Sequence, residues 1–183
     1  MADRFVTSNS AYGSFYKAIP LEPKINSAPP PPETDATHIG RERVARRKEG
    51  NLAKLLRSQN LREKEVLGDG NCQFRALADQ LYGQEDHHQT VRGLVIQQLE
   101  AGAEHYHGFV PGRYSDYLKA MARSGTWGDH VTLQAAADIL GVRINVLTDY
   151  ITDGFIEVIP QQQKSEKILK ITFWQEVHYN SVQ

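Results

Sequence analysis

Residues 69–77 read Asp-Gly-Asn-Cys-Gln-Phe-Arg-Ala-Leu, and the rest of the chain is organised around them. A polar loop leads into Cys72, the single cysteine, and an amphipathic helical pattern begins at once. The apolar stripe runs at helical spacing from Phe74 to Leu81, and Gly83 follows as a C-terminal cap. We therefore expect Cys72 at a helix N-terminus, where free N–H groups and the helix dipole favour a thiolate and lower the pKa of the thiol.

A single cysteine has two interpretations. Most such residues are buried and act as small hydrophobic side chains. A nucleophilic cysteine needs a base that takes its proton and a group that orients the base. The choice depends on what the rest of the chain supplies.

The composition indicates a globular protein without an extreme charge. The chain has 183 residues, is 40% hydrophobic and 23% charged, and carries a net charge of −1, which predicts one domain with a tail. This charge gives no reason to expect a nucleic-acid or membrane partner. One cysteine excludes an internal disulfide framework and a cysteine-rich zinc site, and fits a reducing compartment. There is no signal-peptide layout and no apolar run near the ~20 residues that span a bilayer. We expect a monomer in the cytoplasm, the nucleus or both.

The N-terminal third differs from the remainder. Residues 1–40 contain the run Pro-Pro-Pro-Pro at 29–32 and no periodic pattern, which predicts a flexible, proline-rich tail. Residues 41–64 are rich in Arg and Lys, and predict one or two helices with a solvated basic face. An import signal or a partner contact is the alternative for that face. One folded domain is assigned to 41–183, with its core motifs in 66–182.

Helices precede strands in the remaining sequence. Three further helices are predicted, from Thr90 to a stop at Gly102, along an apolar stripe over 114–121, and over 131–140 between the N-cap Asp129 and the terminator Gly141. Alternating patterns predict strands at 142–148, 155–159, 167–174 and 177–182. Short connections favour an antiparallel meander. The fold class is α+β.

The last predicted strand carries the best candidate for a base. His178 and Asn180 are two residues apart, so an extended backbone places both on one side. Asn180 can then bond one ring nitrogen of His178 while the other nitrogen faces the thiol, as in papain-like proteases. The sequence ends at Gln183, directly after this segment, and terminal residues are often poorly ordered, so the sequence leaves open whether these last residues fray.

The loop before Cys72 offers groups for a developing oxyanion. Asp69, Asn71 and the backbone N–H groups around Gly70 and Cys72 can converge there. Alternatively, Asp69 only braces the loop, as Asp often does in turns. The paired histidines at 87–88 and at 105 and 107 are too few to complete a metal site, so no metal is expected. His130 starts an apolar helix, which favours a structural role over that of a base.

Three separated motifs together resemble one family. The loop motif at 69–76, the Trp-Gly-Asp-His motif at 127–130 and His-Tyr-Asn at 178–180 are similar to those of the OTU (ovarian tumour) cysteine proteases. The fuller strings at 68–77 and 127–138 look closest to plant members. The likeness spans about residues 60–182.

This resemblance implies a fold and an activity. It implies a papain-like domain whose mostly antiparallel central sheet packs between helices, and a deubiquitinase that cleaves isopeptide bonds at the C-terminal glycine of ubiquitin or polyubiquitin without a cofactor. It implies Cys72 as nucleophile, His178 as base, Asn180 as its orienting group, and Asp69 as the loop aspartate of the site. Trp127, Asp129 and His130 are expected to give structural support. The alternatives are a weakly active or inactive ubiquitin-binding module and a protease of another ubiquitin-like modifier.

Overall fold

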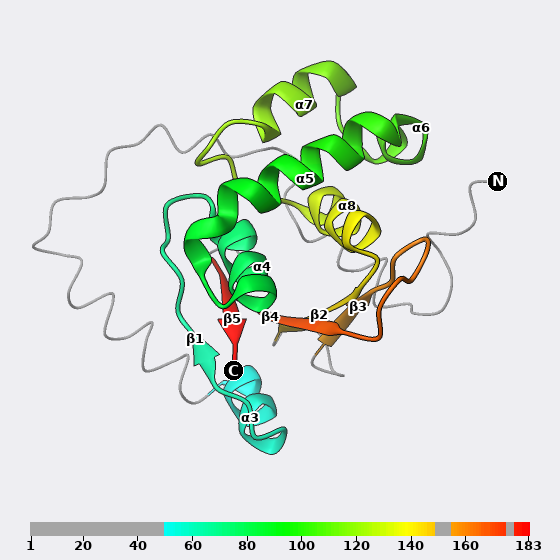
Figure 1. Ribbon diagram of the computed structural model, residues 1–183. Helices are drawn as coiled ribbons and strands as arrows, with labels where there is room; N and C mark the ends of the chain where they lie inside the picture. The colour runs from blue at the N-terminus through cyan, green and yellow to red at the C-terminus, as the bar shows by residue number, and fades with distance from the viewer. Residues whose placement is uncertain (1–49, 149–154, 175–177) are drawn as a thin grey trace, which may run out of the picture.

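The computed structural model describes residues 50–148, 155–174 and 178–183 (Figure 1). The expected tail at 1–40 and part of the basic segment lie outside these residues. The helices are α3 (Asn51–Ser58), α4 (Cys72–Tyr82), η2 (Glu85–His87), α5 (His88–Ala101), α6 (Ala103–Tyr106), η3 (His107–Phe109), α7 (Tyr114–Met121) and α8 (His130–Leu140). The strands are β1 (Glu63–Lys64), β2 (Arg143–Thr148), β3 (Phe155–Val158), β4 (Ile168–Trp174) and β5 (His178–Val182).

The five strands form one mixed sheet in the order β1-β5-β4-β2-β3. Three of the neighbouring pairs are antiparallel, and β2 and β4 are parallel. The expected α+β class and mostly antiparallel sheet are confirmed, but the expected meander is wrong. In β4, Ile171 and Thr172 face opposite sides of the sheet and both are fully buried. A strand buried on both faces belongs inside the sheet, so β4 lies between β2 and β5, and β3 takes the edge.

Helices cover both faces of the sheet. On one face, α4, α5 and α8 pack over the main core, which includes Phe74, Leu133 and Ile171. On the other face, α3 places Leu52 and Leu56 in a smaller cluster that also contains Leu147, Trp174 and Val182. Each buried leucine contributes about 1.5–3 kcal/mol relative to an exposed one. The sheet is therefore packed between helices, as expected.

Most helix ends fall where the sequence places them. Gly83 and Gly141 end α4 and α8 in the left-handed conformation. Asp129 caps α8 by accepting bonds from the N–H groups of Val131 and Thr132. The expected start of α5 at Thr90 is wrong, because the 3-10 turn η2 runs directly into the helix at His88.

Candidate active site

Cys72 is the first residue of α4, and its side chain is only 4% exposed. The backbone N–H groups of Tyr179 and Gln73 are near enough to its sulfur to lower the pKa of the thiol. Tyr179 lies on β5 directly after His178, and α4 packs against β5. The helix N-terminus and the last strand thus bring the two candidate catalytic residues to one place.

The pKa of the Cys72 thiol differs from the expectation. Burial raises this pKa above its ordinary value, and the negative charge of Asp69 adds to the rise. The neighbouring backbone N–H groups lower it, but by less than burial raises it. The direction is therefore opposite to the lowering expected from the helix N-terminus, because burial outweighs these groups.

The imidazole of His178 is held by backbone. Its Nε2 lies 3.0 Å from the carbonyl oxygen of Val66. A carbonyl only accepts, so Nε2 carries a proton, and in the neutral ring Nδ1 is the nitrogen that can take one. The ring also lies against Gly68, where a Cβ would be 3.5 Å from its Cε1. The segment 66–68, just before the Cys72 loop, therefore sets both the tautomer and the position of this histidine.

Asn180 is linked to His178 through Val66. Its Oδ1 accepts a bond from the N–H of Val66 at 3.1 Å, and Val66 in turn accepts from His178. Its Nδ2 donates to Glu63 at 3.0 Å. Glu63 also accepts bonds from Trp174 and Thr172, so one carboxylate joins β1 to β4 and β5. The asparagine thus fixes the segment that holds the histidine.

The last strand is paired along both edges. Strand β5 pairs with β4 on one side and with β1 on the other. Arg62 and Gln183 exchange two backbone hydrogen bonds of 2.7 and 2.8 Å. The end of β5 is therefore held in the sheet by β1, a strand that was not predicted from the sequence.

Asp69 braces the loop. Its carboxylate accepts from the N–H of Asn71 at 3.0 Å and forms an ion pair with Arg75 at 2.8 Å. Partial burial raises the pKa of Asp69, but the bonds from Arg75 and Asn71 outweigh burial and hold this pKa well below its usual range. These contacts favour the bracing role among the two roles considered for Asp69.

Two loops meet at Gly70. This residue has φ +83°, and a Cβ on it would lie 2.0 Å from the carbonyl oxygen of Gly125. The side-chain oxygen of Asn71 accepts from the N–H of Gly125 at 2.8 Å, while the N–H of Asn71 is bound to Asp69. Asn71 thus serves the loop contact, and the N–H groups of Gly70 and Cys72 are the ones that can face an oxyanion.

The motif at 127–130 supports the first turn of α4. The amide of Gln73 donates to the carbonyl of Asp129 and accepts from Thr132. A Cβ at Gly128 would lie 2.1 Å from that amide, so glycine makes room for it. Trp127 is half-buried in the same loop. His130 is buried, and burial lowers its pKa while the charge of Asp129 opposes this. These positions agree with the expected structural support.

Arg92 and Glu63 were not identified from the sequence. Arg92 lies in α5 and is 2% exposed, and it donates to the side chain of Asn71 at 2.7 Å. It shares the helical stripe of Val95 and Leu99, and a charged residue on a buried stripe is an unusual feature that could have identified it. Glu63 had no comparable pattern, because its strand has only two residues.

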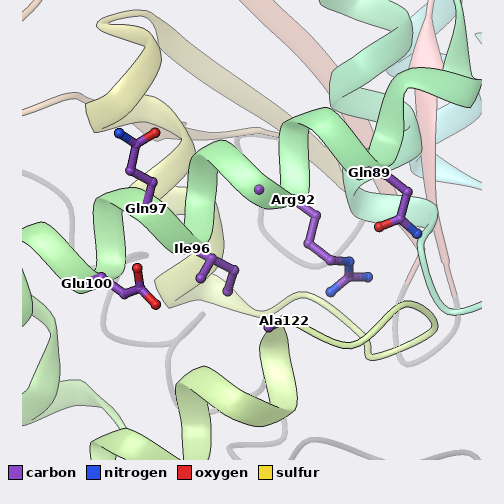
Figure 2. A pocket seen from close by; sticks show the side chains of 7 residues that line it. Gln89, Arg92, Ile96, Gln97, Glu100 and Ala122 are labelled. Carbon is purple, nitrogen blue, oxygen red and sulfur yellow. The ribbon is translucent and has the colours of Figure 1, made fainter.

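A surface depression lies between α5 and the C-terminal end of α7 (Figure 2). Its lining includes Gln89, Arg92, Ile96, Gln97, Glu100 and Ala122. It includes neither Cys72 nor His178, so we do not assign it to the catalytic site. Within residues 50–148, 155–174 and 178–183, no three His, Cys, Asp or Glu side chains gather as metal ligands, and no helix has the length and apolar character to cross a membrane.

The sequence is similar to known proteins over most of these elements. Residues 67–181 match the family model of OTU-like cysteine proteases. OVARIAN TUMOR DOMAIN-containing deubiquitinating enzyme 9 of Arabidopsis thaliana is 53% identical over 131 residues, which are 72% of this chain and 38% of the relative. Enzyme 10 of the same series and organism is 47% identical over 164 residues, which are 90% of this chain and 43% of the relative. The chain spans less than half the length of these two relatives.

Solved structures share the fold. The OTU domain of OTUD1 aligns with a TM-score of 0.63 at 21% identity, over 71% of this chain and 90% of that chain. An OTU domain in complex with ubiquitin aligns with a TM-score of 0.57 at 23% identity, over 67% of this chain and 69% of that chain. The arrangement of sheet and helices therefore has solved counterparts.

Proposed function

Because this chain belongs to the OTU-like cysteine protease family, we propose that it is a thiol-dependent deubiquitinating enzyme that hydrolyses isopeptide bonds at the C-terminal glycine of ubiquitin. One observation carries the proposal: α4, which begins at Cys72, packs against β5, which begins at His178, and the backbone N–H of Tyr179 acts on the thiol. The relatives' names as deubiquitinating enzymes support the reaction. The solved complex of an OTU domain with ubiquitin supports the substrate.

In the first step, His178 and Cys72 form the acyl-enzyme. Nδ1 of His178 takes the proton of the thiol, and the sulfur attacks the carbonyl carbon of the ubiquitin glycine. The backbone N–H groups of Gly70 and Cys72 stabilise the oxyanion. The protonated His178 gives its proton to the leaving lysine amine as the C–N bond breaks.

In the second step, water releases ubiquitin. Nδ1 of His178 takes a proton from water, the hydroxide attacks the thioester, and the thiol of Cys72 is restored. The bond from Nε2 to the carbonyl of Val66 keeps the ring in the required tautomer during both steps. Asn180 acts by holding Val66 in place.

A ubiquitin-binding module of low activity is the second candidate. The observation in its favour is the resting state of Cys72, which is 4% exposed and whose pKa is raised by burial. Such a site needs a bound substrate to open it and to favour the thiolate. This candidate predicts tight ubiquitin binding with very slow turnover.

Ubiquitin with a cysteine-reactive group at its C-terminus tests the proposal. The parent protein should form a covalent adduct, and Cys72→Ala should form none because no other cysteine exists. His178→Ala should react about 100-fold more slowly or worse, since general-base catalysis contributes about 10²–10⁴-fold. His107→Ala, which changes an exposed histidine, is the matched control and should react at the parental rate.

The outcomes separate the candidates. No adduct and no cleavage of polyubiquitin by the folded parent protein would refute the protease. Binding of unmodified ubiquitin under those conditions would then favour the low-activity module. Adducts with probes of other ubiquitin-like modifiers, in place of ubiquitin, would assign a different substrate.

A further inference from the structure

Arg92 joins three parts of the structure behind the Cys72 loop. Its side chain leaves α5 next to the depression and extends towards the segment that follows α7 (Figure 2). Nη1 donates to the carbonyl of Met121 at 2.7 Å, and Nη2 donates to the carbonyl of Thr126 at 2.8 Å and to Oδ1 of Asn71 at 2.7 Å. One guanidinium thus holds residues 121–126 against the residue that precedes Cys72.

The charge of Arg92 is not neutralised by a direct partner. Its guanidinium donates to two backbone carbonyls and one side-chain amide oxygen, and lies 3.9 Å from the ring centroid of Phe74. Among the ion pairs of the described residues, none includes Arg92. Burial lowers the pKa of Arg92 to about 10, so the group still carries its charge at neutral pH. A buried cation without a carboxylate is costly, which makes a role for its charge worth testing.

The surroundings of Cys72 leave Arg92 as a source of positive charge. From its own loop, the negative Asp69 opposes the thiolate. From β5, Tyr179 is fully buried with a raised pKa and is neutral, and His178 is the base. From α5, Arg92 binds Oδ1 of Asn71, the residue directly before Cys72, at 2.7 Å, and a positive charge at this place has the sign that favours a thiolate.

We propose that Arg92 is a positioning residue for Cys72. The hydrogen bond from its guanidinium to Asn71 fixes the loop that precedes Cys72, and its buried positive charge favours the thiolate. The proposal rests on Cys72 being the nucleophile. It predicts that the effect of the charge can be separated from the effect of the hydrogen bonds. Arg92→Lys keeps the positive charge but loses the planar guanidinium that makes several hydrogen bonds, whereas Arg92→Gln loses both.

The test uses iodoacetamide, because alkylation reports on Cys72 alone in a chain with one cysteine. The alkylation rate of folded parent, Arg92→Lys and Arg92→Gln is measured from pH 6 to 10. In Arg92→Gln, the pH midpoint of the alkylation rate should rise. The alkylation rate near neutral pH should then fall about tenfold, which corresponds to a shift of one pKa unit. Arg92→Lys should keep the parental midpoint but react more slowly with the ubiquitin probe.

The control is Ser124→Ala, which removes another donor to Oδ1 of Asn71 without a change of charge and should leave the midpoint unchanged. An unchanged midpoint in Arg92→Gln, or equal shifts in Arg92→Gln and Arg92→Lys, would overturn the proposal. If circular dichroism shows that Arg92→Gln does not fold, Arg92→Lys decides: a parental midpoint supports the proposal and a shifted one refutes it. Failure of the parent protein to react with the ubiquitin probe would refute the deubiquitinase proposal instead. The alkylation rates would still test the effect of Arg92 on Cys72, because alkylation does not require ubiquitin.

Discussion

Gly70 shows how closely two backbones approach at this site. Its φ of +83° and the carbonyl of Gly125 both exclude a side chain. Gly70→Ala should therefore lower the free energy of unfolding by more than the roughly 1–2 kcal/mol that a left-handed alanine costs, because the loops must also separate. Labelling by the ubiquitin probe should fall at least tenfold. Urea unfolding and adduct formation measure the two effects.

Gly83→Ala is the matched control for this prediction. Gly83 has φ +71°, but nothing lies within 4 Å of the Cβ that it would carry. The variant Gly83→Ala should lose only the free energy of unfolding that a left-handed alanine costs, and it should keep the parental rate of labelling by the ubiquitin probe. Equal losses of stability in the two variants would show that the contact with Gly125 is unimportant.

Asp69 should make stability depend on pH. Its pKa is lowered in the folded protein, so its stabilising effect is complete above the unfolded value of about 4 and is lost as the pH falls below that value. Asp69→Asn should destabilise the protein by about 1 kcal/mol at pH 7 and by less at pH 3. Urea unfolding at both pH values checks this.

Asp86→Asn is the control, because the carboxylate of Asp86 also contacts Arg75 but is 93% exposed. Its stability should stay within about 0.5 kcal/mol of the parent at both pH values. Identical losses at pH 7 and pH 3 in Asp69→Asn would argue against the ion pair with Arg75.

The positions of individual residues could be predicted from the sequence where they depend on neighbouring residues in the chain. The helix start at Cys72 and the cap at Asp129 follow from local pattern, and the structure has both. The role of Val66 could not be predicted, because Val66 binds Asn180 and His178 through its backbone N–H and carbonyl, which nearly every residue has. The sign of the Cys72 pKa shift depends on burial by distant segments, which local pattern does not reveal.

At the scale of elements, strand positions were predictable but their pairing was not. Alternation locates β2, β3 and β4 to within a residue or two. The parallel pairing of β2 with β4 depends on which strand is buried on both faces. Strand β1 has only two residues, too few to give a periodic signal, although it completes the sheet beside β5.

Glu63 is the residue through which β1 acts on the site. Oε1 of Glu63 accepts all three bonds, from Asn180, Trp174 and Thr172, and Glu63→Gln weakens them because it removes the negative charge of this acceptor. We expect a loss of about 1–3 kcal/mol of stability and slower labelling by the ubiquitin probe. Glu65→Gln, an exposed neighbour on the same segment, is the control and should change neither. Parental labelling by Glu63→Gln would contradict this role.

At the scale of the whole molecule, residues 50–66 pack with the rest of the fold. Helix α3 covers one face of the sheet, and β1 pairs with β5. A chain of residues 50–183 should therefore keep labelling within about twofold of the parent, whereas residues 65–183 should lose it together with the cover over Trp174. Adduct formation and circular dichroism of both chains test this. Full labelling of 65–183 would show that α3 and β1 are dispensable.

The contact between Val66 and His178 joins residues 112 positions apart. Closing so long a loop is entropically costly, and contacts of this kind tend to form late in folding. Cys72 can thus take its place in α4 before His178, the proposed base, reaches Val66. Under the proposed mechanism, the order of folding itself would keep the only thiol of the chain from being activated before the surrounding structure encloses it.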